Sequence, residues 1–140
     1  MKNLSILLLF LLAGMRLAAQ TPVGEWKTID DATNKPKSHL QLYMQDGKIY
    51  GKVVKMLISS PDRKCDKCPG DRQNKPIMNM VVLENMELKD GYWQNGRILD
   101  PDNGKWYTCK FWLKEGDPNV LVVRGYIGFL YRTQYWYRVK

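Results

Sequence analysis

Short sequences that favour tight turns recur along this chain, and they constrain its fold more than any other feature. Each places Gly after Asn, Asp or Glu, and Gly and Asn accept the positive φ of hairpin turns. Four of them separate apolar runs and predict turns: Asp46-Gly47, Asp90-Gly91, Asn103-Gly104 and residues 115–119. A fifth, Asn95-Gly96, would divide a short run in two, so we interpret it as a bulge within a strand. No long helical period lies between these turns, which predicts antiparallel strands.

The runs between the turns are rich in β-branched and aromatic residues, as strands are. Residues 105–114 alternate most clearly, because Tyr107, Cys109, Phe111 and Leu113 share one face. Such alternation predicts an antiparallel sheet with one buried face. On this basis we expect eight strands, at residues 24–29, 38–45, 48–58, 80–89, 91–100, 105–114, 119–127 and 130–139.

Eight consecutive antiparallel strands predict a small all-β domain that closes into an up-and-down barrel. Closure is favoured because it removes the exposed edges of the sheet. A β-sandwich of the same strands is the structural alternative. One connection is much longer than the others, since residues 59–79 contain three prolines and two cysteines. A loop of this length in a small domain is usually functional or tethered.

The N-terminal residues have the layout of a secretory signal peptide. Lys2 precedes a short apolar run at residues 4–12, and the small residues Ala18-Ala19 suit cleavage. The run is far shorter than the roughly 20 residues of a transmembrane helix. We therefore expect a signal peptide at residues 1–19, a barrel domain at residues 20–140 and no transmembrane segment in the mature protein. The predicted location is outside the cytoplasm, either periplasmic or extracellular.

The positive charge of the chain does not predict nucleic-acid binding. Removal of Lys2 and Arg16 with the signal peptide would lower the formal net charge from +8 to +6. The remaining basic residues are spread along the chain and form neither a basic tail nor a basic helix. A solvated basic surface explains them, with weak attraction to anionic envelope surfaces as a minor alternative.

Two motifs at the ends of the strand region resemble the lipocalin and calycin superfamily. Gly24-x-Trp26 opens the first strand and Trp136-x-Arg138 closes the last one. In that superfamily a Gly-x-Trp and a terminal-strand Arg meet at the closed end of the barrel, where the Trp ring holds the guanidinium by cation–π attraction. The resemblance implies an eight-stranded lipocalin-like β-barrel, with Gly24, Trp26 and Arg138 in a structural role at its closure.

A wider set of motifs resembles a more specific family. In order along the chain they are Gly24-x-Trp26, Gly47-Lys48-x-Tyr50-Gly51, Cys65-x-x-Cys68, Asp100-Pro101-x-x-Gly104-x-x-Tyr107, Arg124-Gly125-Tyr126 and Trp136-x-Arg138. Together they resemble the small exported bacterial proteins grouped as domain of unknown function 2147. The resemblance covers nearly all of the mature chain and implies a bacterial envelope setting, but it implies no particular activity.

The pair Cys65 and Cys68 lies within the long connection, and we interpret it as a small structural disulfide of an exported protein. A redox role is the alternative, because Arg63, Lys64 and Lys67 would favour a thiolate. Thioredoxin-like chemistry, however, places the first cysteine at a helix N-terminus, and Pro69-Gly70 follows here instead. Cys109 shares a face with apolar residues and is expected to be a buried free thiol.

No catalytic, metal or cofactor site is predicted. A zinc site needs four ligands, and besides the cysteine pair the chain offers only Cys109 and His39. His39 is expected on the outer face of a strand and has no nucleophile partner in a known motif. Residues 100–104 resemble the start of a calcium loop, but Phe111 occupies the position where a bidentate Glu is required. We therefore expect a protein that is not an enzyme.

The last two predicted strands carry the candidate ligand-binding residues. Arg124 and Tyr126 share one face of residues 119–127, and Arg132, Gln134 and Trp136 share one face of residues 130–139. If these faces are interior, they line a polar, cationic pocket that suits an anion. If they are exterior, the side chains are solvated. The sequence leaves both open.

The sequence thus favours non-catalytic binding of a small apolar or anionic molecule by an exported barrel. The first alternative is an envelope module that contacts another protein through residues 59–79. The second is a thiol–disulfide protein that acts through Cys65 and Cys68. Neither nucleic acid nor a cofactor is expected as a partner, and no protein partner is identified.

Overall fold

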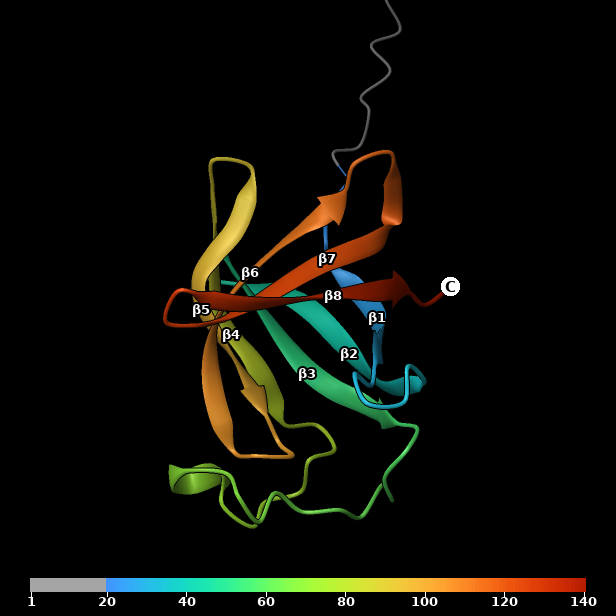
Figure 1. The fold of residues 1–140 in the computed structure, drawn as a ribbon, viewed down its shortest axis with the longest axis vertical. Helices are drawn as coiled ribbons and strands as arrows, with labels where there is room; N and C mark the ends of the chain where they lie inside the picture. The colour runs from blue at the N-terminus through green and yellow to red at the C-terminus, as the bar shows by residue number, and fades with distance from the viewer. Residues whose placement is uncertain (1–19) are drawn as a thin grey trace, which may run out of the picture.

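All the alternating runs of the sequence form strands, and these strands close into one antiparallel barrel in sequence order (Figure 1). A computed structural model describes residues 20–140, so the predicted signal peptide at residues 1–19 lies outside the described residues. The strands are β1 (Gly24–Ile29), β2 (Pro36–Gln45), β3 (Lys48–Met56), β4 (Val81–Lys89), β5 (Tyr92–Asp100), β6 (Lys105–Lys114), β7 (Asp117–Ile127) and β8 (Leu130–Arg138). Strand β1 pairs with β8 as well as with β2, which closes the sheet. The predicted barrel is confirmed, and the sandwich alternative is wrong.

The observed strand boundaries differ from the predicted ones by at most two residues. Strand β2 begins at Pro36, two residues before the predicted start, because proline is tolerated as the first residue of a strand. Strand β3 ends at Met56, two residues early, where the chain leaves the sheet for the long connection. Residues 57 and 58 therefore belong to that connection.

A β-bulge interrupts β5 where the sequence predicts it. Asn95 has φ 65° and the register with β6 shifts between Trp93 and Gly96, yet β5 continues through to Asp100. A Cβ atom at Gly96 would overlap the Glu84 carbonyl oxygen, so only glycine fits against β4 there. Strand β4 has an irregularity of its own at Asn85, with φ 60°, which no turn signal in the sequence predicts.

The two ends of the barrel differ. The closed end contains the start of β1, the end of β8 and the turns that connect β2 to β3, β4 to β5 and β6 to β7. Large buried side chains fill the interior: Trp26, Leu42, Ile49, Leu83, Met86, Phe111, Leu121 and Trp136. The opposite end, which we call the open end, contains the turns that connect β1 to β2, β5 to β6 and β7 to β8, together with the long connection.

The long connection, residues 57–80, folds onto the open end rather than extending into solvent. A disulfide joins Cys65 to Cys68, as the sequence predicts, and a single 3-10 turn follows at Gly70–Arg72. Backbone hydrogen bonds tie the connection to itself, including Cys65 N to the Lys75 carbonyl at 2.8 Å. Ile77 and Met80 are buried in the barrel core. The connection is therefore part of the folded domain.

Candidate ligand-binding cavity

A cavity of about 570 Å³ occupies the open half of the barrel, which is within the size range of small-molecule sites. Its inner wall is apolar because the inward face of each strand carries aliphatic or aromatic residues. That wall includes Leu40, Val53, Val82, Ile98, Leu99, Val123 and Trp136. Gly125 also lies in this wall and has no side chain. A Cβ atom there would meet only the Cβ of Tyr107, 4.0 Å away. Gly125 therefore adds to the free volume.

Charged side chains surround the mouth of the cavity in equal numbers of each sign. Three are acidic and three are basic: Asp31, Asp100, Asp102, Lys37, Arg63 and Arg132. All but Asp100 belong to two hydrogen-bonded groups at this mouth. Arg132 donates to Asp31 at 2.9 Å, while Lys37 and Arg63 donate to the two carboxylate oxygens of Asp102 at 2.5 and 2.8 Å. The mouth is thus polar but close to neutral.

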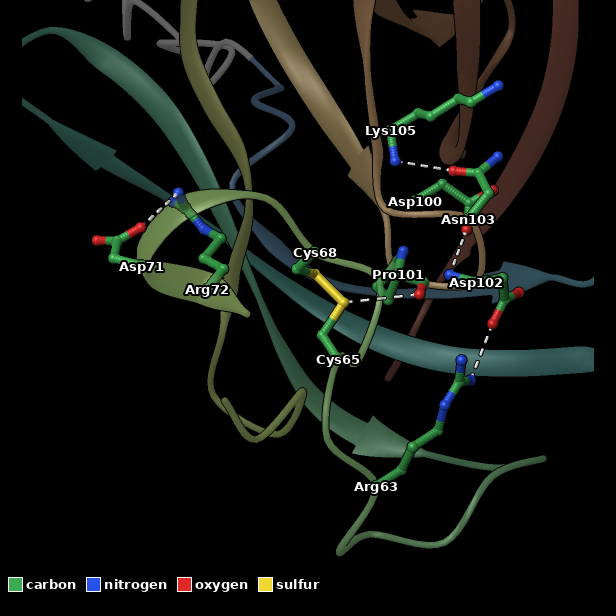
Figure 2. The surroundings of a disulfide bond; sticks show 10 residues. All are labelled: Arg63, Cys65, Cys68, Asp71, Arg72, Asp100, Pro101, Asp102, Asn103 and Lys105. Atoms are coloured by element: carbon green, nitrogen blue, oxygen red, sulfur yellow. Dashed lines mark hydrogen bonds and ion pairs between the residues drawn. A yellow bond between two sulfur atoms is a disulfide. The ribbon is translucent and has the colours of Figure 1, made fainter. Parts of the chain in front are cut away.

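Asp102 connects three separate segments at the rim. Lys37 comes from β2, Arg63 from the long connection and Asp102 from the turn between β5 and β6. Desolvation by burial raises the pKa of Asp102, but the hydrogen bonds and charges of Lys37 and Arg63 outweigh it, so the pKa lies below its ordinary value. Asp102 is therefore held as the carboxylate, and Figure 2 shows its bond to Arg63 beside the disulfide.

A hydrogen-bond relay leads from the apolar interior to the mouth. The buried indole N–H of Trp136 donates to Gln134 Oε1 at 3.1 Å, and Gln134 Nε2 donates to Asp31 Oδ2 at 2.7 Å. Deeper in the wall, the hydroxyls of Thr28 and Ser38 lie 2.7 Å apart. These groups give the cavity fixed polar positions between its apolar wall and its charged mouth.

The predicted ligand-binding residues divide between the two faces of the barrel. Strand pairing sets Val123 opposite Gln134 and Gly125 opposite Arg132, so these positions share the interior face. Arg132, Gln134 and Trp136 accordingly line the cavity.

Arg124 and Tyr126 lie on the outer face, which corrects the expectation that they share a pocket with the residues of the last strand. Arg124 is opposite Thr133, and its guanidinium lies 4.3 Å from the centre of the Tyr131 ring. The polarity of both faces of β8 hid this division, because neither face is apolar throughout.

Sequence reasoning missed Asp31, Lys37, Arg63 and Asp102 as residues of the mouth. They come from two turns, the start of β2 and the long connection, where the local sequence indicates only turns and a loop. The available signal was topological: in an up-and-down barrel, alternate turns meet at the same end. Asp31 and Asp102 lie in two such turns.

At the closed end, Arg138 and Trp26 lie opposite each other in neighbouring strands. The guanidinium is 4.4 Å from the Trp26 ring and donates to the carbonyls of Thr21, Val23 and Pro118 at 3.0 to 3.2 Å. The Trp26 indole N–H donates to the Pro22 carbonyl at 2.8 Å. Gly24 has φ 141°, and a Cβ atom there would lie 2.8 Å from Arg138 Nη1. The three residues therefore pack around the N-terminal segment.

The cysteines are buried. Cys65 and Cys68 are 0% and 3% exposed, and Cys65 Sγ lies 3.6 Å from the Pro101 carbonyl oxygen (Figure 2). Because a disulfide sulfur carries no proton, this is a packing contact against the turn that contains Asp102. Burial raises the pKa of the Cys109 thiol to about 12, so it stays protonated at neutral pH.

The remaining candidates lie apart from the cavity or have other partners. His39 Nδ1 lies 3.4 Å from Glu25 Oε1 on the outer side of β1 and β2. Within residues 20–140, His, Cys, Asp and Glu side chains form no group of three or more that could hold a metal ion. Over the same residues there is no helix with the length and apolar character needed to cross a membrane.

Comparison with known proteins supports the fold and identifies the family. No curated protein matches the chain. A solved structure described as protein HP1028 from the human pathogen Helicobacter pylori, belonging to the lipocalin family, is similar with a TM-score of 0.73 and 18% sequence identity, covering 84% of this chain and 82% of that one. At this identity the similarity shows a shared lipocalin-like fold. A family model matches residues 24–138, from the first strand to the last, and the chain therefore belongs to the family described as "Uncharacterized protein conserved in bacteria (DUF2147)".

Proposed function

We propose that this protein is an exported, non-catalytic carrier that binds a small amphiphilic molecule in the barrel cavity. The observation that carries the proposal is the gradient of polarity inside one cavity, from an apolar wall to a mouth of paired charges. An apolar body is stabilised by the wall, and a polar end can exchange hydrogen bonds with the relay of Gln134 and with the mouth. The lipocalin-like fold of the solved structure is consistent with such a role.

The charge balance of the mouth favours a neutral or zwitterionic polar end over a simple anion. Arg132 is paired with Asp31, and both Lys37 and Arg63 are paired with Asp102. An anion that bound to any of these cations would have to displace a carboxylate or tolerate its repulsion. The apolar member of the sequence-based expectation is therefore preferred to the anionic one.

The test compares two fluorescent probes of similar apolar size, neutral N-phenyl-1-naphthylamine and anionic 1-anilinonaphthalene-8-sulfonate. We expect the neutral probe to bind at least as tightly as the anionic probe. Gly125→Phe should place a ring in the free volume beside Tyr107 and weaken binding of the neutral probe by about tenfold or more, equivalent to ~1.4 kcal/mol. Thr133→Phe, on the outer face of the neighbouring strand, is the matched control and should leave probe binding unchanged.

Native mass spectrometry of protein purified from its own cell envelope extends the test to the natural ligand. A co-purifying small molecule that is present in the wild type and absent from Gly125→Phe supports the proposal. Equal probe binding by the wild type and Gly125→Phe would contradict it, provided that the circular dichroism of the two proteins is the same.

A further inference from the structure

Beyond the cavity, the outer surface of the last two strands is unusual for a water-exposed sheet. The turn between β7 and β8 consists of residues 127–130, where Ile127 pairs with Leu130 and Gly128 has φ 58°. Three of its side chains are apolar and largely exposed: Ile127 at 65%, Leu130 at 63% and Phe129 at 91%. We call residues 127–130 the hairpin tip. Monomeric soluble proteins rarely expose several large apolar side chains side by side without a binding role.

An aromatic and basic surface continues from the hairpin tip along the outer faces of β6, β7 and β8. We call it the aromatic–basic face, and it consists of Lys110, Trp112, Arg124, Tyr126, Tyr131 and Tyr135. Its cations lie against rings: Arg124 is 4.3 Å from the Tyr131 ring centre, and Lys110 is 4.0 Å from that of Tyr92. Among residues 20–140, neither Arg124 nor Lys110 forms an ion pair, and residues 118–140 contain no Asp or Glu. The face is therefore positively charged without compensation.

We infer that the hairpin tip and the aromatic–basic face form a docking surface for an anionic lipid bilayer. Each component matches one layer of a membrane surface. Apolar side chains at a narrow convex tip enter the acyl region, Tyr and Trp rings favour the interface, and Lys and Arg are attracted to anionic headgroups. A flat protein partner would need a pocket to accept the protruding Phe129, whereas a fluid bilayer rearranges around it. The formal net charge of +6 that residues 20–140 carry acts in the same direction over longer distances.

The position of the hairpin tip relates docking to the cavity. Ile127, Leu130 and Tyr131 line the cavity as well as being exposed, so the tip is one side of the mouth. Leu57 and Ile58 form a second exposed apolar segment near the mouth. The residues on either side of this segment, Met56 and Ser59, line the same cavity. Insertion of the tip would place the mouth at the bilayer surface, so an amphiphile could pass between membrane and cavity without crossing bulk water. This last step rests on the proposed function, whereas docking itself does not.

The test is co-sedimentation of the purified protein with vesicles of phosphatidylethanolamine and phosphatidylglycerol, compared with vesicles of phosphatidylcholine alone. We expect binding to the anionic vesicles that weakens as salt is added. Leu130→Ser should reduce this binding several-fold. Leu88→Ser is the matched control, because Leu88 is 60% exposed but lies at the closed end, and it should bind as the wild type does.

The contribution of charge is tested separately. Arg124→Gln should lower vesicle affinity about fivefold, while Lys89→Gln, also at the closed end, should not.

A second measurement reports insertion directly. Phe129→Cys carrying an environment-sensitive nitrobenzoxadiazole label should become brighter and blue-shifted with anionic vesicles, and labelled Leu88→Cys should not. The native cysteines do not interfere, because Cys65 and Cys68 form a disulfide and Cys109 is 1% exposed. Absence of vesicle binding, or equal loss of binding in Leu130→Ser and Leu88→Ser, overturns the inference. The inference is also overturned if the wild type self-associates but does not bind vesicles, and Leu130→Ser abolishes the self-association. Gly125→Phe should retain vesicle binding while losing the probe, so failure of docking and failure of the cavity are distinguishable.

Discussion

At the scale of single residues, Arg138 stands out among the charged side chains of the barrel, because it combines three hydrogen bonds to backbone carbonyls with a cation–π contact. One guanidinium donates to three carbonyls from two segments and stacks on a ring that is 0% exposed. The planar, permanently charged fork of arginine is suited to this task, and lysine is not, because an ammonium offers no flat face to the ring. We therefore expect Arg138 and Trp26 to contribute to the stability of the closed end rather than to ligand binding.

Truncation of either residue should lower stability without changing the ligand preference of the folded protein. Trp26→Ala removes a fully buried indole, and we expect a loss of ~3–5 kcal/mol in the free energy of unfolding. Arg138→Ala should also destabilise, because three carbonyls lose their donor. Arg124→Ala on the outer face is the control and should cost much less than Trp26→Ala, about 1 kcal/mol or less, through the loss of its contact with the Tyr131 ring. Urea unfolding measures all three, and a wild-type midpoint for Trp26→Ala would contradict the closure.

At the scale of elements, the long connection is held against the turn between β5 and β6 by a close backbone approach. Gly104, with φ 72°, ends that turn, and a Cβ atom there would overlap the carbonyl group of Lys67. The disulfide keeps Lys67 in a tight chain reversal, and Cys65 packs on Pro101 in the same turn. Glycine is therefore required at position 104 for two reasons, its positive φ and the absence of a side chain.

A pair of alanine substitutions separates these two reasons. Gly104→Ala should loosen residues 57–80, because strain at positive φ is joined by a steric overlap with Lys67. Gly116→Ala meets the same kind of strain, with φ 78°, but its surroundings are open. Gly116→Ala measures the cost of the strain alone, so urea unfolding should show a larger loss of stability in Gly104→Ala, and hydrogen exchange at residues 57–80 should be faster in that variant. Equal losses of stability in the two variants would show that contact with Lys67 is unimportant.

Most of the elements could be predicted from the sequence, and the exceptions have physical explanations. Turn residues and period-two alternation are local signals, so β1 and β6 have their predicted boundaries and the bulge at Asn95 is confirmed. The packing of residues 57–80 depends on contacts with a turn some 36 positions further along the chain, as between Cys65 and Pro101, and no local pattern encodes it. The outward position of Arg124 likewise depends on pairing register, since its strand has buried residues on both faces, including Val122 and Val123.

At the scale of the whole molecule, the two ends of the barrel differ in what stabilises them. Packing of large side chains and the contacts of Arg138 concentrate stability at the closed end, which leaves the open end free to keep a cavity that weakens the core. The open end is held instead by polar contacts between segments that are far apart in sequence. Asp102 is central to them, because Lys37 and Arg63 both bind it and come from different segments.

The stability of the open end should therefore depend on pH through Asp102. Its pKa is lower in the folded protein than in the unfolded chain, where the pKa of an Asp is about 3.9. A group of this kind stabilises the fold fully above the unfolded pKa, and the contribution is lost as the pH falls through the lower, folded value. Below about pH 4 we expect protection against hydrogen exchange, measured relative to the intrinsic exchange rate at each pH, to fall first at the turn between β1 and β2 and at residues 57–80, before the strands of the closed end.

The variant Asp102→Asn isolates this contribution, because asparagine keeps the shape of the side chain and cannot ionise. At neutral pH it should already show the lower protection against exchange that the wild type shows only in acid, and its protection at the rim should change less between neutral and acidic pH. Asp90→Asn, in the turn between β4 and β5 at the closed end, is the matched control and should follow the wild type. If Asp102→Asn and the wild type respond to acid identically, the rim is held by the backbone contacts of residues 57–80 instead. Because Lys37, Arg63 and Asp102 all line the cavity mouth, the neutral probe should also dissociate faster from Asp102→Asn if a rigid rim retains a bound molecule.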